Sequence, residues 1–139
     1  MFTQILLATD GSEHAMRAAE KASIIANANQ QAKVTIVYVI DGATSKSDVL
    51  SEGSKEAIEE KRKQRLQTTE DILRTHKINY EVKVLRGEPG PTIVKHANDQ
   101  AYDLVVIGSR GLNTFQEMVL GSVSHKVAKR VQCPVMIVK

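Results

Sequence analysis

A segment rich in glycine and serine, between positions 108 and 124, has the residue types and spacing of an anion-binding site. Gly108, Gly111 and Gly121 follow the apolar run at residues 103–107 (DLVVI), and Ser122 stands directly after the last glycine. Glycines leave backbone N–H groups accessible, and the first turn of a helix beginning near Ser122 would add further free N–H donors. The spacing therefore predicts a phosphate site where a strand ends and a helix begins.

The residues of this segment also have plainer interpretations. Gly108 and Gly111 alone could form a turn that ends a strand, but Gly121 and Ser122 at a helix start favour phosphate binding. Ser122 could bond a phosphate, cap the helix, or do both, because a cap residue faces the open end of its helix. Arg110 could pair with a phosphate or simply be solvated. Helix-start residues in the predicted phosphate site are Gly121, Ser122, Val123 and Ser124.

Apolar periodicity places this segment in an alternation of strands and helices. Such an alternation, without repeats or linkers, predicts a single domain over residues 1–139 with an α/β fold. We expect an open, mainly parallel five-stranded sheet, doubly wound with helices on both faces. The strands are expected at 2–9, 33–40, 79–85, 104–107 and 134–138. The helices are expected from 15, from 55, through 93–97 with Pro91 in the first turn, and over 122–131, and a long loop at 41–54 is expected to be mobile or to form a lid.

In sheets of this kind, ligands bind beyond the carboxyl ends of the strands, where the strand order reverses. Asp10, Val39 and Gly108 each end a predicted strand, so topology alone would bring them to one crevice. Asp10 could coordinate Mg²⁺ held by phosphates or accept a hydrogen bond from a nucleotide. It could equally make a local turn to Gly11 and Ser12.

The chain resembles the universal stress protein family along nearly its whole length. The resemblance rests on the glycine spacing (two residues, then nine, then Gly-Ser), the opening ILLATDGS at 5–12, RGEP at 86–89, DLVVIGSRG at 103–111 and the ending CPVMIV at 133–138. It implies ATP binding, with Asp10 contacting the nucleotide and Val39 meeting adenine through its backbone. It also implies a homodimer formed through the last strand, 134–138. Thr9 departs from the pattern, since many members carry Val or Tyr there.

Composition excludes several other functions. The net charge is +3 with scattered basic residues and 4% aromatics, which disfavours nucleic acid as a partner. No GxxxxGK[ST] motif occurs and no GxGxxG motif follows a strand, which argues against a P-loop NTPase or the usual dinucleotide enzyme. The apolar runs are too short to span a membrane. A single cysteine, Cys133, is typical of a protein in a reducing compartment, so we expect a cytoplasmic location. Cys133 precedes Pro134 in an apolar segment and is expected to be inert. The four histidines lack metal-ligand spacing; only His125, at the last helix start, is a candidate proton carrier, with a surface role as the alternative.

Three functional hypotheses remain open from the sequence. The first is a regulatory ATP-binding protein that responds to stress through an unknown protein partner, with Mg²⁺ at the nucleotide and slow hydrolysis at most. Slow hydrolysis is expected because no strong general base stands beside the predicted phosphates. The second is an ATPase or self-phosphorylating enzyme with Ser122 or Ser124 as acceptor. The third is a dimeric scaffold whose nucleotide site is vestigial.

Overall fold

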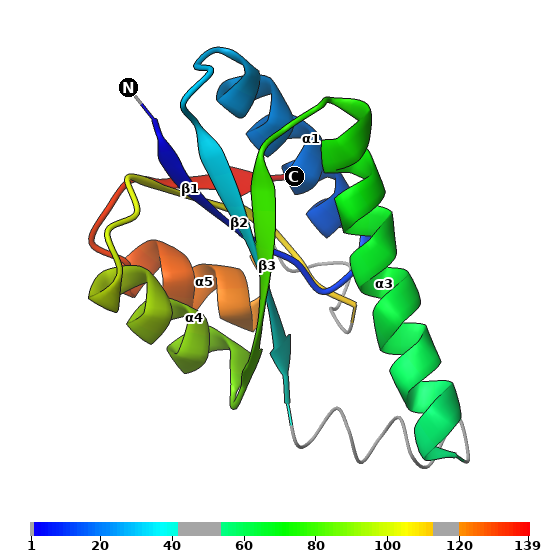
Figure 1. The fold of residues 1–139 in the computed structure, drawn as a ribbon. Helices are drawn as coiled ribbons and strands as arrows, with labels where there is room; N and C mark the ends of the chain where they lie inside the picture. The colour runs from blue at the N-terminus through cyan, green and yellow to red at the C-terminus, as the bar shows by residue number, and fades with distance from the viewer. Residues whose placement is uncertain (1, 42–53, 113–119) are drawn as a thin grey trace.

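A computed structural model describes residues 2–41, 54–112 and 120–139 of the chain, and most of the predicted 41–54 loop lies outside these residues. Within them, five parallel strands form one sheet and four helices cover it, so the predicted α/β fold is confirmed (Figure 1). The strand order is β3-β2-β1-β4-β5. The elements are β1 (Gln4–Ala8), α1 (Glu13–Asn27), β2 (Lys33–Ile40), α3 (Lys55–Thr75), β3 (Tyr80–Arg86), α4 (Pro89–Asp99), β4 (Leu104–Gly108), α5 (Ser122–Arg130) and β5 (Val135–Val138).

The middle of the sheet is buried on both faces, as is usual for parallel strands that helices cover on either side. β1 pairs with β2 on one side and β4 on the other, with Leu7 opposite both Ile36 and Val106. These three side chains are fully buried. β3 lies at one edge of the sheet and β5 forms the other. The strand order reverses at β1, between β2 and β4, and it is there that the crossovers leave a crevice.

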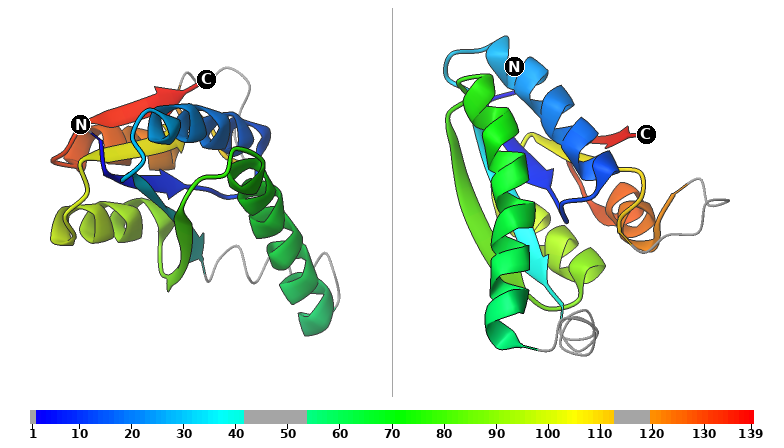
Figure 2. Two further views of the ribbon diagram at one scale, coloured as in Figure 1. Left: turned by 45° about the horizontal axis from the view of Figure 1, so that its top comes forward. Right: turned by 90° about the vertical axis from the view of Figure 1, so that its right-hand side faces the viewer.

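Alternate residues of each strand pack against two helix pairs (Figure 2). On one face, Leu7 and Val106 belong to a core cluster with α1 and with Leu73 of α3. On the other face, Leu6 and Val105 pack with α4 and α5. The period of two that separates these clusters follows from the pleat of a strand.

Capping and small residues explain how α1 fits closely to the sheet. The Ser12 hydroxyl accepts a hydrogen bond from the Ala15 N–H at 3.2 Å, which fixes the start of the helix at Glu13, two residues before the predicted start. Alanines 15, 18, 19, 22 and 26 form its buried stripe, so its backbone can approach the strands. α1 thus follows the end of β1 after one short turn, and that turn contains Asp10.

α4 begins at Pro89, and Pro91 lies within its first turn, as the sequence indicated. Proline is suited to this position because its missing N–H would find no partner inside the helix. Glu88 therefore becomes the residue that precedes the helix, and its carboxylate lies at the opening between α4 and α5.

Candidate functional site

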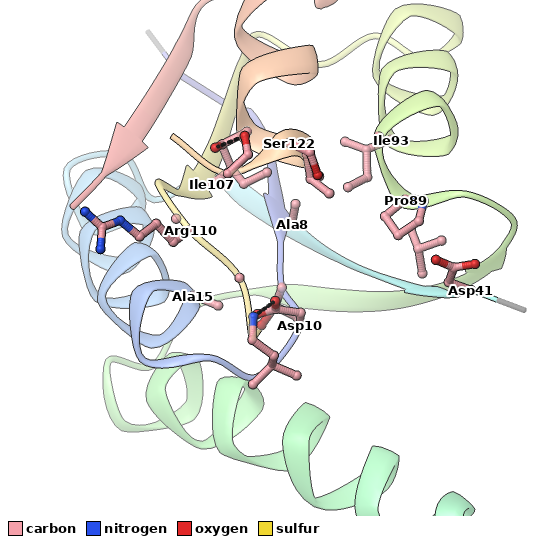
Figure 3. Close-up of a pocket in the computed structure, with 18 of the residues that line it drawn as sticks. Ala8, Asp10, Ala15, Asp41, Pro89, Ile93, Ile107, Arg110 and Ser122 are labelled. Atoms are coloured by element: carbon pink, nitrogen blue, oxygen red, sulfur yellow. Dashed lines mark hydrogen bonds between the residues drawn. The ribbon is translucent and has the colours of Figure 1, made fainter. Parts of the chain in front are cut away.

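A pocket of about 340 Å³ opens at the carboxyl ends of β1, β2 and β4, beneath the N-termini of α4 and α5 (Figure 3). Its position agrees with the crevice expected from the reversal of strand order. Every residue that the sequence assigned to a nucleotide site lines this one pocket. They are Asp10, Val39, Gly108, Arg110, Gly111, Gly121, Ser122, Val123 and Ser124.

Hydrogen bonds to Ser109 hold the two halves of the glycine segment together. The Ser109 carbonyl accepts from the Gly121 N–H and from the Ser124 hydroxyl, each at 2.7 Å. The Ser109 N–H donates to the Val138 carbonyl at the end of β5, also at 2.7 Å. The end of β4 and the start of α5 are thereby fixed side by side, although eleven residues separate Ser109 from Gly121 at the intervening positions 110–120.

Gly108 and Gly111 also have a structural role that the sequence did not indicate. The sequence suggested that their missing side chains would let a phosphate approach the backbone. In the structure, a Cβ at Gly108 would lie 2.7 Å from the backbone carbon of His14, and one at Gly111 would lie 2.5 Å from Oδ2 of Asp10. The two glycines therefore make room for the first turn of α1 and for a carboxylate of the protein itself.

Asp10 joins the two turns that border the pocket. Its Oδ1 accepts from the Ser12 N–H at 2.9 Å, and its Oδ2 accepts from the Leu112 N–H at 3.0 Å. The first bond is the local turn that was the plainer interpretation of this residue. Because a carboxylate has about four lone-pair positions, two N–H donors leave capacity for a ligand or a cation.

Helix α3 forms a wall of the site that the sequence did not indicate. The Thr9 and Thr69 hydroxyls lie 2.9 Å apart in a buried contact, and Thr9 Oγ1 also accepts from the Gly11 N–H at 3.2 Å. Gly11 has φ +80°, and a Cβ there would lie 2.6 Å from Cβ of Arg65. Thr9, the residue that departs from the family pattern, thus contacts Thr69, and this contact connects α3 to the turn that contains Asp10.

At the start of α5, Gly121 is the N-cap residue and Ser122 is the first helical residue, so Ser122 is not the cap. The cap position has no side-chain hydrogen bond to the helix, because glycine has no side chain to offer. Ser124 is buried, and its hydroxyl donates to the carbonyls of Ser109 and Gly121. Ser122 is exposed and lines the pocket. In Figure 3, Ala8 lies between Ser122 and Asp10.

Arg110 lines the pocket, but its guanidinium extends away from Asp10 and Ser122 toward α1 (Figure 3). Burial lowers the pKa of the His14 side chain, and the positive charges of Arg17 and then Arg110 lower it further. The Arg110 side chain is therefore directed to the α1 side of the site.

The structure adds pocket residues that sequence reasoning missed. Lys126 of α5 lines the pocket, and its Nζ lies 3.5 Å from Oε1 of Glu88, which also lines it. A usable signal was present, because Lys126 follows Ser122 by four residues and so shares its helix face. No local signal indicates Arg65, which reaches the pocket from α3 only through tertiary packing.

Two other candidates lie outside the pocket lining. His125 is exposed on α5 and does not line the pocket. Burial raises the pKa of the Cys133 thiol, in the direction expected for an inert cysteine.

Within 2–41, 54–112 and 120–139, no three His, Cys, Asp or Glu side chains form a group that could hold a metal ion. No helix in the same residues has the length and apolar character needed to cross a membrane.

Comparisons with known proteins agree with the fold and the motifs. The model of the universal stress protein family matches residues 1–139. The chain is 30% identical to universal stress protein YxiE of Bacillus subtilis (strain 168) over 149 aligned positions, which cover all of both chains. It is similar to the solved structure of MJ0577, with a TM-score of 0.83, 29% identity and coverage of 100% and 96% of the two chains.

A second solved structure carries a ligand. It is a universal stress protein in complex with cAMP, and it is similar to this chain with a TM-score of 0.71 and 27% identity. The match covers 99% of this chain and 97% of that one.

Proposed function

We propose that this chain, which belongs to the universal stress protein family, binds an adenine nucleotide in the pocket at the carboxyl ends of β1, β2 and β4. The observation that carries the proposal is the α5 start. Gly121 offers no capping side chain, and the exposed Ser122 hydroxyl stands beside free first-turn N–H groups. A phosphate at that position would satisfy those donors.

The remaining lining fits the rest of a nucleotide. A volume of about 340 Å³ is within the range of small-ligand sites. Val39 and Ile93 supply apolar surface for a base, and Asp10 supplies a carboxylate. A relative that binds cAMP supports adenine as the base. We assign ATP as the ligand, with Mg²⁺ bound through its phosphates and Asp10 as the nearest candidate carboxylate.

Regulation rather than rapid catalysis is the proposed role. Asp10 already accepts two backbone N–H groups, and His125 does not line the pocket, so neither is placed as a strong general base. Hydrolysis would then be slow at most. The bound nucleotide would tune association with a protein partner under stress, in a homodimer formed through residues 134–138.

The positions of Ser122 and Ser124, the two acceptors considered for self-phosphorylation, favour Ser122 over Ser124. Ser124 is 2% exposed and donates to two carbonyls, so it is a poor phosphate acceptor. Ser122 is exposed and lines the pocket. If label from [γ-³²P]ATP stays on the denatured protein and disappears in Ser122→Ala, the protein is an enzyme and the binding-only proposal is wrong.

Calorimetric titration with Mg-ATP, ADP and AMP tests nucleotide binding directly. The matched variant is Gly121→Val, whose backbone at φ −71° and ψ 168° is accessible to valine, so the substitution adds no backbone strain, and urea unfolding of the variant checks that it is folded. We expect micromolar binding by the wild type and a loss of at least about tenfold in the variant, because a branched side chain obstructs the phosphate position.

The scaffold alternative predicts a different result. Wild-type protein freed of carried-over nucleotide would give no heat with any of the three ligands, and Gly121→Val would leave its partner association unchanged. Equal binding by wild type and variant would show that a nucleotide binds elsewhere, and would overturn the proposed site.

A further inference from the structure

The mouth of the pocket between α4 and α5 is crossed by the side chain of Lys126. Its stem lies against Gly90, where an added Cβ would be 2.8 Å from the Lys126 Cδ. Its Nζ lies 3.5 Å from Oε1 of Glu88, the residue before α4. The missing side chain at Gly90 therefore creates the channel in which the lysine lies across the two helix starts.

The pairing with Glu88 holds Lys126 only weakly. The Lys126 side chain is 37% exposed and that of Glu88 is 69% exposed, and their separation is at the long end for an ion pair. Pairs of this kind in contact with water contribute little to stability. An anion with several charges would compete with the single carboxylate of Glu88 for the lysine.

Helix geometry brings Lys126 within reach of an anion at the start of α5. Side chains four residues apart on a helix have Cβ atoms about 5–6 Å apart, so Lys126 and Ser122 are neighbours on one face. Helical side chains also lean toward the N-terminus, which directs the flexible lysine stem toward Ser122 and the free N–H groups.

The charges around the pocket give this lysine a specific task. Three carboxylates line the described pocket, Asp10, Asp41 and Glu88, and they oppose a phosphate chain. Arg110 is directed toward α1, and the stem of Arg65 lies against Gly11 in the turn after β1. Lys126 is the lining cation on the helix whose N-terminus faces the predicted phosphate position.

We infer that Lys126 is a specificity-determining residue that leaves Glu88 and binds the phosphate chain of the nucleotide, so that affinity rises with the phosphate charge of the ligand. The inference rests on the proposed nucleotide function. Without nucleotide, Glu88 holds the Lys126 side chain at the mouth of the pocket, and a bound polyphosphate takes the place of Glu88 as the partner of Lys126.

Titration of Lys126→Gln with Mg-ATP, AMP and adenosine tests the inference. We expect ATP affinity to fall about tenfold, as for loss of a partly exposed charge-assisted hydrogen bond, AMP affinity to fall less, and adenosine affinity to change less than twofold. The matched control is Lys129→Gln, which removes the same charge from an exposed position of α5 outside the pocket. It should retain the wild-type order of affinities.

A second variant separates the pairing from a general charge effect. Glu88→Gln should tighten ATP binding about threefold, and this gain should shrink in the double variant with Lys126→Gln, because coupled residues are not additive. Equal losses for ATP and adenosine in Lys126→Gln, or no loss, would overturn the inference while leaving nucleotide binding intact. If the wild type binds none of the ligands, the proposed function itself is wrong, and the inference fails with it.

Discussion

Asp10 shows how a single carboxylate can serve both the fold and the site. It accepts one N–H from its own turn and one from Leu112, which follows the distant glycine pair. The missing Cβ of Gly111 lets the carboxylate come this close. A residue that appears in the sequence to be a ligand for a nucleotide is therefore also the connection between the ends of β1 and β4.

Asp10→Asn should weaken both stability and nucleotide binding. An amide keeps one acceptor oxygen and turns a donor toward the second N–H, which leaves that N–H without a partner and costs about 1–3 kcal/mol of unfolding free energy. Urea unfolding measures the stability loss and calorimetry the affinity. As a control, Asp99→Asn removes an exposed carboxylate paired with Lys95 on α4 and should cost under about 0.5 kcal/mol. If Asp10→Asn is as harmless as the control, Asp10 does not connect the two turns.

Helix α1 can lie close to the sheet because Gly108 has no side chain. The His14 backbone occupies the space where a side chain at 108 would be, so the first turn of α1 lies directly on the end of β4. The glycine is not needed for an unusual backbone angle, since positive φ is recorded at Gly11 and Gly87 among the described glycines. Close approach of two elements is the reason for it.

Gly108→Ala and Gly90→Ala form a matched pair that tests this explanation. The new methyl at 108 meets a backbone that cannot move independently, so we expect a loss of about 1–3 kcal/mol. The methyl at 90 meets the flexible Lys126 side chain, which can move aside, and adds only the modest cost of a Cβ before Pro91, so the loss should be under about 1 kcal/mol. Thermal and urea unfolding of both variants would reveal the difference. Equal effects would mean that α1 can shift away from β4 without cost.

The sequence predicted the strands, the order of the elements and the nine pocket residues at the strand ends and the α5 start because these depend on local patterns. Continuous apolar runs mark buried strands, and parallel strands place their carboxyl ends at one edge. Arg65 and the Thr9–Thr69 contact were not predictable, since α3 reaches the site through tertiary packing across sixty positions.

The two edges of the sheet differ in their protection against association. β3 carries Glu81, Lys83 and Arg86, and charges of this kind deter pairing with another strand. β5 carries no charged residue from Val135 to Val138. The carbonyls of Pro134 and Val138 bond to β4, so alternation directs the backbone groups of Val135 and Ile137 to the open edge. The proposed homodimer would pair this edge with its own copy about a two-fold axis.

Met136→Lys is expected to convert that dimer to a monomer. Met136 is 36% exposed on the edge strand, and a second copy of the strand would bring two lysines together across the axis, where like charges repel and must be desolvated. Light scattering after size exclusion, over a range of concentrations, measures the mass. Val84→Lys, at a 51% exposed position of the opposite edge, should leave the dimer intact. A monomeric wild type, or a Met136→Lys protein that stays dimeric, would show that β5 is not the dimer edge.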